Sequence, residues 1–338
     1  MSDKILGGET GASFSDVLGH EHAKAHLENA IRDGHISHAY LFEGLRGVGK
    51  KTLALSVAAA LFKDADSRRL IQRDAHPDLI RIRPEEGKRS ISKEQIQTGL
   101  VSSIDIRPYR GTYKIYLIEE AEKLTPEAQN TMLKTIEEPP AYGVIILLSE
   151  QSASLLPTIL SRVVRISLEP LPMELIINEL VRRGAQPFQA QAVAAFSAGS
   201  LGNALALAGD EDFIRMRKEL YDFLAAAPEL SPDKVLAGSA VFETYKADTD
   251  RLLELMLLWH RDLLVCQLPE QDASQGQSRL LILDYQDALL RCASRYSKDQ
   301  LFEICSMIHR VGEDLKRNVN RDLAMDMLFT MLVKGDFH

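Results

Sequence analysis

The chain has 338 residues, 45% of them hydrophobic and 26% charged, which is typical of a globular protein with room for two or three domains. Its formal net charge of −8 argues against a molecule that binds nucleic acid over its whole surface, so any DNA contact should be local or made by partner subunits. The apolar stretch 252–266 is interrupted by charged residues such as Glu254 and Arg261, and no signal peptide pattern is present, so we expect a cytoplasmic protein without a membrane span.

Three cysteines stand in the last quarter of the chain, at Cys266, Cys292 and Cys305, and none forms a C-x-x-C pair. That spacing favours neither a disulfide framework nor a structural zinc site. We expect the three side chains to be small hydrophobic groups buried in helices.

The first 170 residues alternate between helical and strand patterns. Apolar residues at helical spacing predict helices over 20–33 and 52–62, with a short buried strand at 40–42 between them. Further strands are predicted at 79–82, 113–118, 144–148 and 163–168. This alternation predicts an α/β fold in which a doubly wound parallel sheet carries helices on both faces.

Two helix starts in this half have strong local signals. Ser92 can cap a helix while Gln95, three residues later, returns the bond. Thr125 supplies a second cap and is followed by proline at the first helical position. That second helix should end at Pro139-Pro140, because proline cannot continue the hydrogen-bond ladder.

From Pro172 onward only helices are evident. They are expected at 173–184, 187–198, 200–208, 249–268, 279–295 and from Ser297 onward. Ser297 and Gln300 form a second capping box. A stretch rich in Pro, Ala, Gly and Ser at 225–239 is a candidate boundary between helical parts.

The strongest motif is Gly44-Leu45-Arg46-Gly47-Val48-Gly49-Lys50-Lys51-Thr52, which follows a strand and opens a helix as a phosphate-binding P-loop requires. Backbone N–H groups of such a loop converge on phosphate, and Lys50 would reach the β- and γ-phosphates. The next position normally holds magnesium through a Ser or Thr hydroxyl, but here it is Lys51. Thr52 comes one step late, about 100° round the helix. The candidate nucleotide-binding residues Gly44, Gly47, Gly49, Lys50, Lys51 and Thr52 therefore favour a structural turn over hydrolysis of Mg-ATP.

A second motif is the apolar strand 115–118 followed by Glu119 and Glu120, about seventy residues after the P-loop. Such a Walker B strand normally ends in an acid that holds magnesium and a second acid that polarises the attacking water. Glu119 is a candidate nucleotide-site residue, but it stands where Asp is usual. We therefore expect Glu120 to be a vestigial or weak base.

A third motif, 156–162, ends in Arg162, which by itself would be read as an exposed charge. Ser161-Arg162-Val163 is similar to the S-R-C motif of clamp-loader ATPases, with Val in place of Cys, and the segment 131–140 resembles their L-L-K-x-x-E-E-P-P segment. Other segments that resemble this family are 17–21, 38–42, the lid segment 199–204 and the C-terminal segment 320–323. From about Phe14 to Leu332, the chain resembles the AAA+ clamp-loader subunits of bacterial DNA polymerase III.

The resemblance implies a domain organisation and a set of partners. It implies an AAA+ P-loop domain at 14–170, a helical lid at 171–210 and an all-helical collar at 211–338. The short, polar and Gly-rich residues 1–13 before them are expected to be disordered. The implied partners are the delta and tau/gamma clamp-loader subunits in a hetero-pentamer, with the sliding clamp and primed DNA reached through the complex and no membrane. DNA-directed DNA polymerase activity would belong to another subunit of the holoenzyme.

The resemblance also implies roles for particular residues. One type of subunit in this family does not power the loader. Lys51, and Gly202 at the position of the lid arginine, are similar to the residues that this type carries there. Arg162 would then act in trans as an arginine finger on a neighbouring subunit's ATP. No cofactor is required on this reading, although weak binding of ATP or ADP stays open. Because the segment 63–75 lacks the four cysteines usual in bacterial members, we expect no zinc and no other metal.

Two alternatives differ in their chemistry. An ATP-hydrolysing tau/gamma-like motor or another AAA+ ATPase is favoured by Lys50, Glu119 and Glu120 but opposed by Lys51 and Gly202. A P-loop small-molecule kinase is disfavoured because half of the chain is helical, with no evident substrate lid. Direct DNA contact stays open as well. Three basic residues lie near Tyr109 and Tyr113, namely Arg107, Arg110 and Lys114. A solvated basic face is the more common explanation for such a group than a DNA-binding surface.

Overall fold

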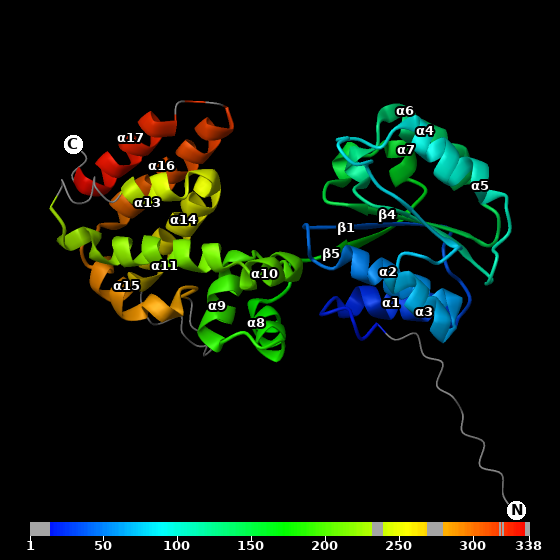
Figure 1. Ribbon diagram of the computed structural model, residues 1–338, viewed down its shortest axis with the longest axis horizontal. Coiled ribbons are helices and arrows are strands. Elements are labelled where there is room, and N and C mark those ends of the chain that lie inside the picture. Colours follow the sequence, from blue (N-terminus) through cyan, green and yellow to red (C-terminus); the bar gives the residue numbers. More distant parts are fainter. Residues whose placement is uncertain (1–13, 232–238, 269–279, 318, 320, 335–338) are drawn as a thin grey trace, which may run out of the picture. The chain divides into compact units, whose positions relative to one another are not determined.

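The computed structural model describes residues 14–231, 239–268, 280–317, 319 and 321–334, so the predicted disorder of 1–13 lies outside the described residues. The chain forms two compact units, drawn in Figure 1. One contains the residues up to Leu171 together with Ser200–Gly202, and the other contains Pro172–Gly199 and the chain from Asn203 onward. None of the described helices is long and apolar enough to cross a membrane.

The first unit is built on a five-stranded parallel sheet with strand order β2-β3-β4-β1-β5. The strands are β1 (Ala39–Gly44), β2 (Leu79–Ile82), β3 (Lys114–Ile118), β4 (Gly143–Ser149) and β5 (Val164–Leu168). Every residue of the central strand β4 is buried, as expected for a strand covered on both faces. The prediction of a doubly wound parallel sheet is confirmed.

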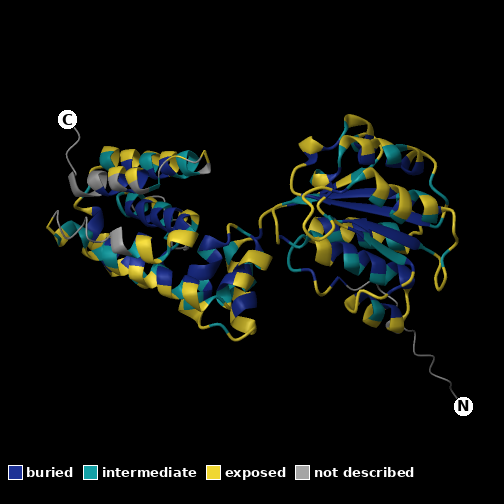
Figure 2. Cartoon of the chain, turned by 45° about the horizontal axis from the view of Figure 1, so that its top comes forward, coloured by how far each residue is buried: buried dark blue, intermediate teal, exposed yellow. Residues whose placement is uncertain are grey.

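Helices cover both faces of this sheet (Figure 1). One face carries α1 (Glu21–Arg32), α2 (Lys50–Phe62) and α3 (Ala65–Gln72). The other carries α4 (Lys93–Ile96), which continues through a π-helical turn (Gln97–Val101) into α5 (Ser102–Ile104), and then α6 (Pro126–Glu137) and α7 (Pro157–Leu160). Figure 2 shows the strands as a buried layer between helices whose outer faces are exposed.

The predicted caps form as expected. Ser92 and Gln95 make both bonds of a capping box at α4, and the Thr125 hydroxyl accepts the N–H of Ala128 at the start of α6. The helix after the P-loop begins at Lys50 rather than at Thr52, because the turn before it closes at Gly49.

The segment 63–75 is held by a hydrogen-bond network. Bacterial members of the resembled family usually carry a zinc module in this segment. The Asp64 carboxylate accepts the backbone N–H of Ser67 at 2.7 Å and caps α3, a helix missed by the sequence analysis. The buried Ser67 hydroxyl also contacts Nε2 of His76 at 2.8 Å, and the His76 ring stacks on Phe62 with 3.9 Å between centroids. Neutral side chains and one carboxylate thus fix this connection.

The regular elements among the described residues of the second unit are all helices. Its helices are α8 (Met173–Arg182), α9 (Pro187–Phe196), α10 (Leu201–Ala208, whose first two residues belong to the other unit), α11 (Glu211–Ala226), α13 (Ser239–Thr244), α14 (Thr249–Cys266), α15 (Gln286–Ala293), α16 (Lys298–Lys316) and α17 (Arg321–Lys334). The capping box of Ser297 and Gln300 is present at α16. The division of this region at residue 210 into lid and collar stays a prediction.

One predicted helix of this unit was too long. The helix expected over 279–295 is a 3₁₀ turn (Leu283–Tyr285) followed by α15. The physical reason is the fully buried carboxylate of Asp262, which accepts the backbone N–H groups of Leu281 and Ile282 at 2.8 and 2.7 Å and so holds that segment out of a helix.

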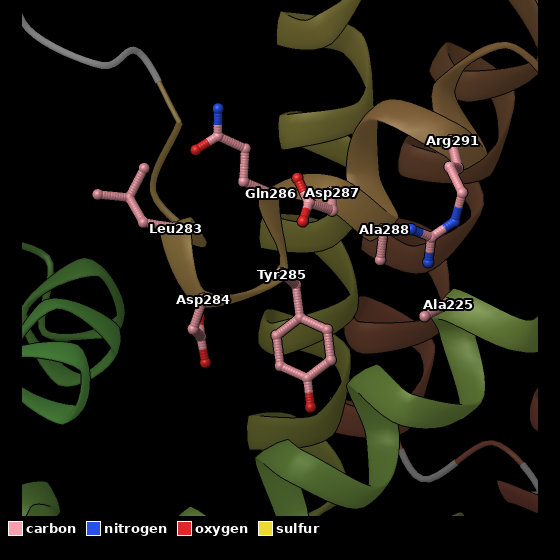
Figure 3. Close-up of a pocket in the computed structure, with 8 residues that line it drawn as sticks. All are labelled: Ala225, Leu283, Asp284, Tyr285, Gln286, Asp287, Ala288 and Arg291. Atoms are coloured by element: carbon pink, nitrogen blue, oxygen red, sulfur yellow. The ribbon is translucent and has the colours of Figure 1, made fainter.

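An aromatic cluster joins α11, α14 and the 3₁₀ turn Leu283–Tyr285 of the second unit. The rings of Tyr221, Trp259 and Tyr285 contact one another, and the Arg217 guanidinium lies over two of them while pairing with Asp284. A hollow of about 440 Å³ lies beside Asp284 and Tyr285 (Figure 3). Two of its polar lining groups are thus already engaged in this network, which makes the hollow part of the packing around the cluster.

Candidate functional site

The P-loop predicted from the sequence connects β1 to α2 at the carboxyl edge of the sheet. Gly44 ends the strand with φ 156°, and a Cβ there would lie 2.4 Å from the carbonyl oxygen of Leu168 on the neighbouring strand β5, so only glycine fits. Lys50 folds back onto this loop and donates from Nζ to the carbonyl oxygens of Gly44 and Leu45 at 2.5 and 2.9 Å. Burial lowers the pKa of Lys50.

Two further segments hold the loop from outside. His20 donates from Nε2 to the carbonyl oxygen of Val48 at 3.0 Å. The Ser200 hydroxyl donates to the carbonyl oxygen of Arg46, and the Gly202 N–H donates to that of Gly47, both at 2.8 Å. The loop is therefore anchored through successive carbonyl groups.

The surroundings of Gly202 leave no room for an arginine side chain at that position. A Cβ at Gly202 would lie 2.8 Å from the Cα of Gly47 and 3.0 Å from its carbonyl oxygen. Because both neighbours are backbone atoms, a side chain at residue 202 requires the two segments to separate. The glycine noticed in the sequence is thus a condition for the direct contact between Ser200–Gly202 and the P-loop.

Lys51 lies against Glu119, across the carboxyl edge of the sheet. Lys51 Nζ is 3.1 Å from Glu119 Oε2, and Glu119 Oε1 accepts from Arg81 Nε at 2.7 Å. Arg81 in turn pairs through NH1 with Asp74 Oδ1 at 2.7 Å. Burial alone would lower the pKa of Arg81, but the hydrogen bonds to Glu119 and Asp74 raise it overall. The result is a network of two cations and two carboxylates, which we call the Lys51 quartet.

The Lys51 quartet leaves no place for the magnesium ion that P-loop enzymes hold. Both oxygens of Glu119 are engaged by cations, and an ammonium group occupies the position from which a Ser or Thr hydroxyl would ligate the metal. Thr52 is exposed on α2. The residues present therefore do not fit magnesium.

Glu120, predicted to be a vestigial or weak base, lies apart from this network. Its backbone is left-handed, with φ 56° and ψ 50°, and its half-exposed side chain pairs with Lys123. Sequence reasoning missed Arg81 and Asp74. The only signal for Arg81 was a single cation in the otherwise apolar strand 79–82.

Arg162 lies just after α7, with 38% of its side chain exposed. Its NH1 donates to the carbonyl oxygen of Thr158 at 2.9 Å and to the Ser161 hydroxyl at 3.1 Å, and its NH2 pairs with Glu137 Oε1 at 2.8 Å. The guanidinium is thus held at the surface of the first unit. The catalytic role predicted for it stays a prediction.

The basic face expected around Tyr109 is smaller than the sequence suggested. Lys114 is buried, not solvated, and donates from Nζ to the carbonyl oxygen of Ser103 in α5 and to that of Ile106 just after it. Tyr109 is 85% exposed, and its loop is held by the buried Asp78 carboxylate, which accepts the backbone N–H groups of Tyr109 and Arg110 at 2.6 and 2.7 Å. Arg107 and Arg110 remain exposed.

Subunits of DNA polymerase III resemble this chain. A family model described as "DNA polymerase III, delta subunit" matches residues 19–172. The DNA polymerase III subunit delta' of Bacillus subtilis is 29% identical over 91% of this chain and 94% of its own length. That of Pseudomonas aeruginosa is 34% identical over 50% of this chain and 54% of its own length.

Subunits of other types also match. The DNA polymerase III subunit tau of Escherichia coli is 34% identical over 58% of this chain, which spans only 32% of that subunit's length. Among solved structures, a gamma subunit-related protein of Thermotoga maritima has a TM-score of 0.45 and 20% identity, and the match covers 91% of this chain and 98% of that one. The match to the Bacillus subtilis delta' subunit thus covers nearly the whole of both chains, whereas the matches to the Pseudomonas aeruginosa delta' subunit and to tau are confined to part of each.

Proposed function

Because the chain belongs to the DNA polymerase III clamp-loader family, we propose that it acts as a delta'-like subunit, which completes the loader without hydrolysing ATP itself. It works in a complex with other clamp-loader subunits. We propose further that this complex is a hetero-pentamer that loads the sliding clamp on primed DNA, and that this chain requires no cofactor.

The Lys51 quartet is the observation that carries the absence of hydrolysis. Phosphoryl transfer in P-loop proteins depends on a magnesium ion that bridges phosphate oxygens and neutralises developing charge. In this chain the acid that would hold the ion is neutralised by Lys51 and Arg81. A tau/gamma-like motor would need that acid to be free of other cations, and it would need a Ser or Thr hydroxyl at the position of Lys51.

Arg162 supports a contribution to a neighbouring subunit. Arginine has five N–H donors, and its Nε–H and one hydrogen on NH2 have no partner among the residues that the structure describes. A partly exposed guanidinium with donors to spare can stabilise negative charge on a transferring phosphoryl group that another subunit holds. This arginine-finger role is part of the proposal.

Reconstitution with partner subunits tests the proposal. The complex containing Arg162→Ala should assemble normally but show DNA- and clamp-stimulated ATPase lowered by about tenfold or more, because arginine fingers act on the transition state. Unchanged ATPase would exclude the finger.

The isolated chain gives the complementary measurement. It should show no turnover of Mg-ATP, and the Lys50→Ala variant serves as the control for any signal. Micromolar binding with turnover that is lost in Lys50→Ala would instead establish the motor alternative.

A further inference from the structure

The helix just before Arg162 is too short to be stable by itself. α7 (Pro157–Leu160) has four residues, whereas isolated helices shorter than about 12 residues are marginal in water. Its position must therefore come from the structure around it. Part of that support is buried Ile159, which belongs to the same hydrophobic cluster as residues of α6 on one face of the sheet.

α6 holds the start of α7 through one buried side chain. Gln129 accepts the backbone N–H of Leu156 through Oε1 at 2.7 Å, and donates from Nε2 to the carbonyl oxygens of Leu124 and Ser154 at 3.2 Å each. Leu156 is the residue that caps α7, so the helix begins at a point fixed by α6.

α6 also reaches the end of α7, through Glu137. The Glu137 carboxylate is 2.8 Å from NH2 of Arg162, whereas the bonds to Thr158 and Ser161 are made by NH1. Glu137 is the last residue of α6, where the helix dipole disfavours a negative charge. The ion pair with Arg162 offsets that cost, and Pro139-Pro140 prevents the helix from extending past it.

We propose that Glu137 is a positioning residue for Arg162, and that it fixes the guanidinium in the orientation in which it meets a neighbouring subunit's nucleotide. The proposal rests on the role given to Arg162 above. Three of the five guanidinium donors are used to hold the group, and the remaining two are left for phosphate oxygens. The contact is not catalytic, because Glu137 acts only through Arg162.

The stimulated ATPase of the reconstituted complex tests this role. Glu137→Gln removes the charge with little change of shape, and should lower kcat roughly fivefold while leaving the KM for ATP unchanged, because a misplaced catalytic group costs transition-state stabilisation. Glu138→Gln, which makes the same chemical change one residue later, is the matched control and should stay within about twofold of wild type. Complex assembly and the unfolding midpoint should be the same in both variants.

A double-variant cycle separates positioning from a general structural effect. Glu137→Gln should lower the rate in the wild-type background and have no further effect in the Arg162→Ala background, because the group it positions is gone. A further loss in that background would overturn the proposal, as would a kcat for Glu137→Gln that equals or exceeds wild type.

The finger role of Arg162 and the positioning role of Glu137 give different results when they fail. If Arg162→Ala lowers ATPase and Glu137→Gln does not, the arginine finger stands and the positioning role of Glu137 is wrong. If Arg162→Ala leaves ATPase unchanged, the finger itself is wrong and the role of Glu137 falls with it.

Discussion

Replacing Arg81 by alanine should destabilise the unit that contains the sheet by about 2 kcal/mol. Arg81 is 13% exposed and bridges the carboxylates of Glu119 and Asp74, and Glu119 is 15% exposed. Removing one partner of a fully buried ion pair costs about 3–5 kcal/mol, and removing a partner of an exposed pair costs about 0.2–1 kcal/mol. The loss at Arg81 lies between these limits, because water reaches the pair and Lys51 still faces Glu119.

The assay has to report on this unit alone. Trp259 is the only tryptophan of the chain and lies in α14 of the other unit, so its fluorescence follows that unit. Hydrogen exchange of the backbone amides in β2 and β3 follows the sheet instead. A loss of 2 kcal/mol corresponds to exchange about 30-fold faster for amides that open with the whole unit. The fluorescence transition in denaturant should not change.

Lys51→Thr is the matched comparison within the same quartet. The Lys51 side chain is 46% exposed, so its loss should cost less than about 1 kcal/mol and change exchange less than fivefold. Equal exchange in wild type and Arg81→Ala, or a larger effect of Lys51→Thr than of Arg81→Ala, would refute the view that Arg81 is the principal partner of Glu119.

Three further predictions follow from other contacts. Gly202→Ala should lower the free energy that holds the P-loop closed by about 1–3 kcal/mol, which would be measured as faster amide exchange at 45–49. Gly312→Ala in α16 is the control and should be neutral or slightly stabilising, because an added Cβ there meets nothing nearer than 3.9 Å. Equal effects of the two substitutions would contradict a steric cause. Burial lowers the pKa of His260 from 6.5 to about 4, so the unfolded chain takes up the proton first as pH falls. The stability present above pH 6.5 should therefore decline towards pH 4 by at most about 3 kcal/mol, and the fluorescence transition of His260→Leu should lose that dependence. Asp78→Asn can accept with only one oxygen and should speed amide exchange at 109 and 110, with a cost of about 1–3 kcal/mol; unchanged exchange there would show that the loop is held by other contacts.

The parts of the fold that depend on local chemistry could be predicted from the sequence. The caps of α4, α6 and α16 are set by side chains within three residues of each helix start, so their signals are read directly. The buried strands follow from short apolar runs, and their alternation with helices is enough to predict a parallel sheet. α11 was missed although its signal is present, since Phe213, Met216, Leu220 and Leu224 repeat at helical spacing.

The parts of the candidate site that depend on distant contacts could not be predicted. Arg81 and Glu119 are 38 residues apart, and the role of Arg81 appears only when β2 and β3 lie side by side. α7 has four residues, too few for periodicity to register, and its position depends on Gln129 and Glu137 of another helix. Lys114 looked solvated because the sequence does not show which carbonyl groups it will meet.

The contact between Gly202 and Gly47 bears on how such a chain could change over evolution. An arginine at residue 202 has no room until the P-loop and the Ser200–Gly202 segment separate, and separation gains nothing while Lys51 still neutralises Glu119. A hydroxyl at residue 51 gains little in turn, because Arg81 still holds the same carboxylate. Each of these changes is of no use without the others, so a path to an ATP-hydrolysing site runs through intermediates that are no better than the starting chain. On the proposed function, an ATP-hydrolysing site therefore requires changes at residues 51, 81 and 202 together, which single substitutions made one at a time do not supply.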